Sequence, residues 1–405
     1  MKMTPKDYMD RESRYGAHNY HPLPVVLDRG EGAFVWDVEG KKYYDFLSAY
    51  SAVNQGHCHP KIVNALVEQA QKLTLTSRAF YNSVLGEYEE YITKYFGYDK
   101  VLPMNTGAEA DETAIKLCRK WAYQKKGIED NKAKIIVCEN NFHGRTTTII
   151  SMSTDPVAKN EFGPYTPGFE IIPYNDINAL EKALQDPNVA GFLFEPIQGE
   201  AGVFLPDEGY LKKSYDLCKK HNVLYIADEV QTGIARTGKL LACDHENVKP
   251  DILILGKAIS GGVIPVSAVL ANDEIMLCIK PGEHGSTFGG FPLAGKVAMA
   301  ALEVVKEEKL AERAEYLGKI FRDQMKSIKS DMIELVRGKG LLNAVVINPK
   351  NGKEAWDVCV EMANNGVLAK PTHQHIIRFA PPLVISEEDL LDACQRIKAS
   401  LAKFE

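Results

Sequence analysis

Two short apolar runs in the middle of the chain each end in a charged residue. The run 252–255 (ILIL) is followed by Gly256 and Lys257, and the run 223–227 (VLYIA) is followed by Asp228. Continuous apolar runs of this length are typical of strands that a parallel sheet buries on both faces. Because ligands of open α/β sheets bind outside the carboxyl ends of the strands, the lysine and the aspartate are predicted to face one ligand.

Further apolar runs of similar length alternate with stretches of helical composition. These predicted strands cover residues 134–138, 169–172, 191–194 and 266–271. Such alternation indicates βα units, so the predicted fold class is α/β with a mostly parallel sheet.

The two ends of the chain show a different pattern. The amino end favours a small sheet with strands at 32–36 and 42–46, which glycines separate. After Pro292 the sequence predicts a long helical stretch from residue 293 to about residue 330 and strands near 334–336 and 341–347. A final helix is expected after Ser386.

Composition and charge limit the possible functions. The 405 residues carry a formal net charge of −6 with scattered Lys and Arg, which argues against nucleic acid as a partner. No run approaches the roughly 18–20 apolar residues of a membrane span, so no membrane partner is expected.

The amino end has neither the apolar core of a signal peptide nor the acid-poor composition of a transit peptide. The eight cysteines show no C-x-x-C spacing, which favours reduced thiols and a cytoplasmic location. The segment His57-Cys58-His59 has no further His/Cys pair at ligand spacing, so no metal is predicted.

Lys257 and Asp228 together suit the chemistry of pyridoxal phosphate. A desolvated lysine has a lowered pKa and is nucleophilic, so Schiff-base formation with an aldehyde is the first hypothesis. The cofactor also needs an acid that keeps its pyridine nitrogen protonated. As alternatives, Lys257 is a solvated strand cap, and Asp228 is a helix N-cap or a magnesium ligand. The chain lacks a G-x-x-x-x-G-K-[ST] loop, which disfavours magnesium.

The segments 224–231 (LYIADEVQ) and 256–259 (GKAI) resemble the class III, or subgroup II, pyridoxal-phosphate aminotransferases. Other motifs of that family occur along nearly the whole chain, at residues 40–46 (GKKYYDF), 56–60 (GHCHP), 105–110 (NTGAEA), 142–145 (FHGR), 195–202 (EPIQGEAG), 286–292 (STFGGFP) and 378–382 (RFAPP).

The resemblance implies the aspartate aminotransferase fold, which is PLP-dependent transferase fold type I. Both chain ends are then expected to form a small α+β domain beside a large domain with the mostly parallel sheet. The predicted division is 1–55 for the amino-terminal part of the small domain, 56–295 for the PLP-binding large domain and 296–405 for the carboxyl-terminal part.

A small-residue turn precedes the predicted helix over 109–121. Such a turn offers backbone N–H groups and the positive end of the helix dipole to an anion, although an ordinary N-cap would have the same composition. The place of this turn in the order of family motifs implies a phosphate cradle formed by Gly107 and Ala108.

The resemblance also implies the groups around the ring of the cofactor. Phe142 would stack on one face, Val230 would pack on the other, and Gln231 would hydrogen-bond the phenolic oxygen. His143 is a further candidate beside the ring, although a lone histidine is more often structural. Glu195 would support the region of Asp228.

Ser286 and Thr287 lie in a glycine-rich loop. Composition alone would make them ordinary turn residues. In the family this loop reaches the cofactor phosphate of the other subunit, so the resemblance implies a homodimer, or a larger oligomer, with a shared active site.

Within the class, residues 15–26 (YGAHNYHPLPVV) are most similar to the ornithine δ-aminotransferases. That resemblance implies that Tyr20 and Arg145 hold the α-carboxylate of ornithine while Tyr50 lines the substrate entrance. It also implies that Glu200 pairs with Arg378.

The implied reaction converts L-ornithine and 2-oxoglutarate into L-glutamate 5-semialdehyde and L-glutamate, in proline biosynthesis and arginine metabolism. Alternative donors within the class are acetylornithine and 4-aminobutyrate. A pyridoxal-phosphate decarboxylase or aminomutase, and a non-catalytic protein that keeps the fold, are further alternatives.

Overall fold

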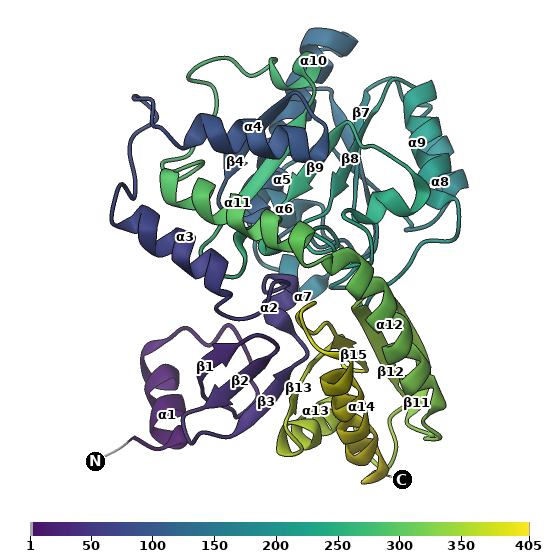
Figure 1. Cartoon of the computed structure of the whole chain (residues 1–405). Coiled ribbons are helices and arrows are strands. Elements are labelled where there is room, and N and C mark those ends of the chain that lie inside the picture. The colour runs from purple at the N-terminus through teal and green to yellow at the C-terminus, as the bar shows by residue number, and fades with distance from the viewer. Residues whose placement is uncertain (1–2, 405) are drawn as a thin grey trace.

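A seven-stranded sheet forms the centre of the larger part of the molecule (Figure 1). The computed structural model describes residues 3–404. The strands are β4 (Lys100–Met104), β5 (Lys134–Cys138), β6 (Phe169–Ile172), β7 (Val189–Phe194), β8 (Leu224–Asp228), β9 (Ile252–Leu255) and β10 (Ser267–Ala271). Their order in the sheet is β4-β10-β9-β8-β7-β5-β6. Only β10 runs antiparallel to its neighbours, so the predicted mostly parallel α/β sheet is confirmed.

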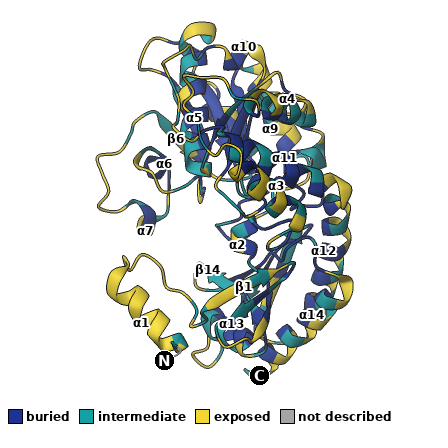
Figure 2. Ribbon diagram, turned by 60° about the vertical axis from the view of Figure 1, so that its left-hand side comes forward, coloured by how far each residue is buried: buried dark blue, intermediate teal, exposed yellow. Residues whose placement is uncertain are grey.

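Alternate residues of a strand point to opposite faces of the sheet. Both sets of side chains are apolar here, so helices cover both faces. Ile252 and Ile254 of β9 share a core with α5 (Gly107–Trp121), whereas Leu253 and Leu255 belong to a second core on the other face. That other face is covered by α4 (Leu85–Phe96), α8 (Ile177–Ala183), α9 (Tyr210–Lys220) and α11 (Pro292–Glu307), and α3 (Pro60–Ala70) packs on α11. Figure 2 shows the strands as the most buried layer of the molecule.

Two four-stranded sheets lie below the large sheet in Figure 1. One contains β1 (Leu27–Glu31), β2 (Phe34–Asp37), β3 (Lys42–Asp45) and β13 (Val367–Leu368). The other contains β11 (Ile333–Lys339), β12 (Leu342–Ile347), β15 (Ile376–Phe379) and β14 (Lys370–Thr372). Since β13 pairs in parallel with β3, segments from both ends of the chain share one sheet. The exact division at residues 55 and 295 stays a prediction.

The stretch predicted to be helical, residues 293–330, is helical over most of its length. The segment forms two helices, α11 and α12 (Leu310–Ser327), because Lys309 adopts a left-handed conformation with φ of 50° and interrupts the hydrogen-bond ladder. The final helix, α14 (Glu387–Ala402), begins after Ser386, whose hydroxyl accepts a hydrogen bond from the Asp389 N–H as an N-cap.

The remaining helices are shorter or peripheral. They are α1 (Pro5–Tyr15), α2 (Ser48–Ser51), α6 (Thr147–Ser151), α7 (Pro156–Lys159), α10 (Asp273–Met276) and α13 (Ala355–Asn364), with a π-helical turn at Ala122–Lys126 and 3₁₀ turns at Ala242–Glu246 and Lys257–Ser260. No residue of α1 is buried (Figure 2). Among the described helices, none has the length and apolar character to cross a membrane.

The His57-Cys58-His59 segment lies just before α3. The His57 ring contacts Asp45 at 2.7 Å, and the His59 ring contacts Glu308 at 2.9 Å. Cys58 is an exposed free thiol, and the other seven cysteines are buried free thiols.

Candidate active site

Two adjoining cavities open where β5, β7, β8 and β9 end. The inner cavity is lined by Gly107, Ala108, Phe142, His143, Glu195, Glu200, Asp228, Val230, Gln231 and Lys257. The outer cavity is lined by Tyr20, Tyr50, Arg145 and Arg378, and again by Phe142, His143 and Glu200. Its volume of about 450 Å³ is within the range of small-molecule sites. The predicted site residues therefore meet here, except Ser286 and Thr287, which line neither cavity.

Lys257 enters the inner cavity from the turn that follows β9. Its φ of 44° is a left-handed conformation, which is costly for a residue with a Cβ and is often found at functional sites. Desolvation in the enclosed cavity lowers the pKa of its amine. Across residues 3–404, no carboxylate lies within ion-pair distance of this amine. The structure therefore holds a partly desolvated amine ready to react with a carbonyl group.

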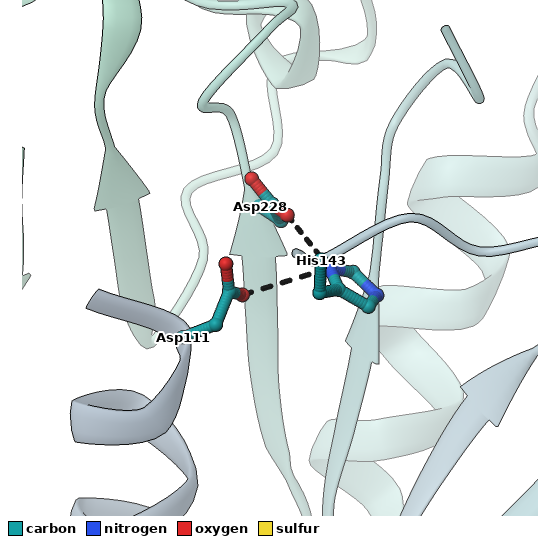
Figure 3. Close-up of side chains that lie close together, drawn as sticks. All are labelled: Asp111, His143 and Asp228. Carbon is teal, nitrogen blue, oxygen red and sulfur yellow. Dashed lines mark hydrogen bonds and ion pairs between the residues drawn. The ribbon is translucent and has the colours of Figure 1, made fainter. Parts of the chain in front are cut away.

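Asp228 ends β8 and faces the same cavity. Its Oδ1 accepts a hydrogen bond from the Val230 N–H at 2.9 Å, and its Oδ2 lies 2.6 Å from His143 Nδ1 (Figure 3). Burial opposes the charged form of His143, but the hydrogen bond to Asp228 and its negative charge together raise the pKa of the histidine. His143 thus belongs to the site as the partner of Asp228, a role that the sequence did not reveal.

Asp111 is a buried acid that the sequence analysis missed. It lies on α5, and its Oδ1 is 3.5 Å from His143 Nδ1 (Figure 3). Burial, and then the negative charge of Asp228, raise the pKa of Asp111 well above its usual value. The missed signal was its position on the helix: Asp111 lies on the face that also buries Ala114, Ile115 and Cys118. An acid on a buried helix face requires an explanation.

The residues predicted to form the phosphate cradle lie at the amino end of α5. Thr106 caps the helix in a capping box with Glu109, and the first helical residue, Gly107, faces the cavity. A Cβ on Gly107 would lie 3.0 Å from Val230 Cγ1, and one on Gly144 would lie 2.7 Å from Ala108 Cβ. These close approaches leave no room for larger side chains beside the free N–H groups. The turn can therefore approach an anion with its backbone.

Phe142 and Val230, which were predicted to enclose the ring of the cofactor, both line the inner cavity, and the backbone of Phe142 contacts Glu195. Glu195 Oε2 accepts a hydrogen bond from the Phe142 N–H at 2.9 Å. Burial is the main cause that raises the pKa of Glu195 to about 8. Gln231 Oε1 is buried and, among the described residues, has no hydrogen-bond partner, so a bound ligand could donate to it.

An ion pair lies at the boundary of the two cavities, because Glu200 lines both and its partner Arg378 lines the outer one. Arg378 Nη1 lies 2.7 Å from Glu200 Oε2, and Arg378 is almost completely buried. Its Nε is buried without a partner among residues 3–404. Tyr50 lies under the guanidinium, with 5.2 Å between Arg378 Cζ and the ring centroid. The pair expected from the family resemblance is therefore present, with donor capacity left on the arginine.

Tyr50 lies on a strained turn. All four residues of α2, from Ser48 to Ser51, have positive φ values between 42° and 72°, so the turn is left-handed. Such a conformation costs roughly 1–2 kcal/mol per residue and persists only where the surroundings enforce it. Tyr50 is therefore positioned by contacts elsewhere in the fold.

Arg236, which was missing from the predicted site, makes one of these contacts. It is fully buried and donates hydrogen bonds to Ser48 Oγ at 3.2 Å, Asn54 Oδ1 at 3.1 Å, Leu341 O at 3.0 Å and Pro381 O at 2.7 Å. A single side chain therefore connects the turn that bears Tyr50 with the segment that follows Arg378.

The outer cavity also includes Tyr20, Arg145 and Lys370. Tyr20 is largely exposed, and the Lys370 ammonium lies 5.9 Å from its ring centroid. Arg145 Cζ lies 5.5 Å from the centroid of Phe142. The outer cavity is thus rich in cations, as a site for carboxylates requires.

Ser286 contacts the cradle only indirectly. Its hydroxyl accepts a hydrogen bond from Asn105 Nδ2 at 2.8 Å, whereas Thr287 is exposed. Their role toward the phosphate of another subunit stays a prediction.

The chain resembles one family of known proteins over almost its whole length. The family model described as aminotransferase class-III matches residues 15–401. The mitochondrial ornithine aminotransferase of Drosophila ananassae is 65% identical over 391 residues, which cover 96% of this chain and 90% of that protein.

Two solved structures match both in sequence and in shape. An ornithine aminotransferase from Toxoplasma gondii, described as having partial occupancy of PLP at its active site, has 52% identity and a TM-score of 0.98 over 100% of this chain and 95% of that one. A structure from Elizabethkingia anophelis has 64% identity and a TM-score of 0.91 over 99% and 100% of the two chains. That protein is described as an acetylornithine aminotransferase.

Proposed function

The chain belongs to the class III aminotransferases, and we propose that it transfers the δ-amino group of L-ornithine to 2-oxoglutarate. The products are L-glutamate 5-semialdehyde and L-glutamate. The observation that carries this proposal is the ion pair of Arg378 with Glu200 beside the cavity of Lys257. The high identity to proteins named ornithine aminotransferases supports the same donor.

The cofactor is pyridoxal 5′-phosphate, and the inner cavity fits it. Lys257 offers an amine for the aldehyde, Asp228 a carboxylate for the ring nitrogen, and Gln231 an unpaired acceptor for the phenolic hydroxyl. The turn at Gly107 offers N–H groups for the phosphate. When bound, this cofactor supplies an electron-withdrawing ring that stabilises negative charge on the substrate carbon.

Lys257 has two tasks in this site. Its amine would hold the cofactor in the resting enzyme, and it would move the proton at the reacting carbon of the substrate. The lowered pKa of the amine suits both tasks. An amine with a lowered pKa is a better nucleophile, and general acid–base catalysis works best when the pKa approaches the working pH.

The reaction makes conflicting demands on Arg378. Ornithine must react through the amine that is distant from its carboxylate, whereas glutamate and 2-oxoglutarate react at the carbon beside theirs. A free arginine close to Lys257 would bind the α-carboxylate of ornithine and present the wrong amine. The pair with Glu200 masks Arg378 for ornithine, and its opening for glutamate would create a bidentate carboxylate site.

We expect Glu200→Ala to change the balance between the two half-reactions. Because Arg378 would then be permanently unmasked, the rate with glutamate relative to ornithine should rise by about tenfold, as for a coupling of 1–3 kcal/mol. Ornithine should also react measurably through its α-amine. Single-turnover absorbance of the bound cofactor with each amino acid, followed by product identification, measures both effects.

Glu200→Asp is the matched control for this variant. It keeps the charge and should stay closer to the parent rate ratio than Glu200→Ala. An unchanged ratio in the alanine variant, with only the δ-product formed, would contradict the gate.

The donor is the point on which the similar proteins differ, because the E. anophelis structure bears the name of an acetylornithine aminotransferase. We expect kcat/KM for ornithine to exceed the values for N-acetylornithine and 4-aminobutyrate by at least about tenfold, which is within the discrimination of one pocket. Initial rates with each donor at saturating 2-oxoglutarate provide the test. A preference for N-acetylornithine would replace ornithine as the donor.

The oligomeric state and the location are further parts of the proposal. We propose a homodimer, or a larger oligomer, in which Ser286 and Thr287 serve the partner's cofactor, and a cytoplasmic enzyme of proline and arginine metabolism. The exposed position of Thr287 is compatible with such a contact. Light scattering of the purified protein gives the oligomeric state, and a fully active monomer would contradict the shared site.

A further inference from the structure

Asp111 is a buried acid to which neither the reaction nor the sequence motifs assign a role. It comes from α5, whereas Asp228 comes from β8, and Figure 3 shows both carboxyl groups beside His143. Suitable oxygen and nitrogen atoms of these three residues all lie within 4.8 Å of one another. Asp111 is only 1% exposed, and its side chain is part of the lining of the inner cavity.

His143 Nδ1 cannot make an equally good hydrogen bond to both acids. It makes a direct hydrogen bond to Asp228 at 2.6 Å, whereas the 3.5 Å to Asp111 is too long for a good one. His143 Nδ1 therefore makes its hydrogen bond to Asp228 and not to Asp111. Among residues 3–404, Asp111 Oδ1 has no hydrogen-bond partner at all.

Further charges around Asp111 disfavour a second carboxylate. The negative groups that act on it are Asp228, Glu195 and Glu112, and His143 is the nearest basic group. Two carboxylates within 4.8 Å of each other in a buried site do not both ionise. Their mutual repulsion and their desolvation both disfavour the second negative charge. Asp228 already accepts hydrogen bonds from Val230 and His143, so it is the one that keeps the charge. A neutral carboxyl group, in contrast, becomes a donor.

We propose that Asp111 is a positioning residue of the cofactor site, which as a neutral carboxylic acid shares its proton with Asp228. The inference rests on the cofactor site of the proposed function, but not on the identity of the amino donor. Asp111 would hold Asp228 from the side of α5, close to the contact with His143. It would also withdraw charge from Asp228 and so moderate how strongly that carboxylate attracts the ring nitrogen.

The protonation of Asp111 has a direct test in the infrared. A difference spectrum between the wild-type holoenzyme and Asp111→Asn at neutral pH should contain the carbonyl stretch of a neutral carboxylic acid, shifted in D₂O. The difference spectrum isolates Asp111 from Glu195, another buried acid. Only carboxylate bands in that spectrum would overturn the proposal.

The effect on Asp228 is read from the bound cofactor. We compare the pH dependence of the cofactor absorbance in wild type, Asp111→Asn and Asp111→Val. The asparagine keeps a neutral donor, whereas the valine keeps the approximate volume without any polar atom. We expect the asparagine variant to titrate as wild type does, and the proton affinity of the cofactor in the valine variant to rise by about three- to tenfold.

The direction of the shift separates the alternatives. If Asp111 were ionised, both substitutions would remove a negative charge and lower the proton affinity of the cofactor. If Asp111 only filled space, the valine variant would match wild type. Either result overturns the proposal. A variant protein that binds the cofactor normally but lacks ornithine activity would contradict the proposed donor without affecting this inference.

Discussion

Replacement of Lys257 by alanine should abolish turnover while the protein stays folded and binds the cofactor without a covalent bond. The same amine holds the cofactor and carries the proton, so both functions are lost together. Loss of a general acid–base group alone typically lowers the rate by about 10²–10⁴-fold, and the loss of covalent exchange adds to this. We therefore expect kcat to fall by about 10⁴-fold or more.

The measurement is a single turnover with ornithine, followed by absorbance, together with borohydride treatment of the resting enzyme. In the wild type borohydride should fix the cofactor to the protein, whereas in Lys257→Ala dialysis should remove it. Lys94→Ala is a suitable control, because that lysine is exposed on α4 and lines neither cavity. Turnover of the Lys257 variant within about tenfold of the parent would remove Lys257 from its role.

The positions of Lys257 and Asp228 could be predicted because local sequence defines them. Each follows a short apolar run, and parallel neighbouring strands bring their carboxyl ends to one edge of the sheet. β8 and β9 are indeed adjacent and parallel. The identities of the cofactor and of the residues around it came from the family resemblance instead, since a turn such as residues 105–108 has many possible functions.

Other features depend on contacts that local sequence does not reveal. In the sequence Asp111 is one polar residue of a predicted helix. Only the fold shows that Asp228 and His143 lie beside it. β4 was not predicted, because its burial is uneven and only its last two residues are fully buried. The break at Lys309 has no glycine or proline to mark it, so helical periodicity continued across it.

The role of Arg236 also depends on contacts with segments that are distant in the sequence. Its replacement by methionine should cause the largest loss of stability. No carboxylate forms an ion pair with this buried guanidinium within residues 3–404; its acceptors are Ser48, Asn54, Leu341 and Pro381. Methionine would leave buried carbonyl groups without donors. Hydrogen bonds to charged groups contribute about 1.5–3 kcal/mol each and do not add fully, so we expect a loss of about 3–5 kcal/mol in the free energy of unfolding.

The same substitution should also displace Tyr50, because the left-handed turn at Ser48–Ser51 would lose one of the contacts that hold it against its strain. Chemical denaturation gives the free energy of unfolding, and KM for ornithine reports on the entrance. Arg11→Met provides the control: this arginine lies on α1, which has no buried residue, so its loss should cost less than about 1 kcal/mol. If both variants unfolded at the same denaturant concentration, Arg236 would not be what holds the turn. A loss of stability without any change in KM would mean that Arg236 stabilises the fold but does not position Tyr50.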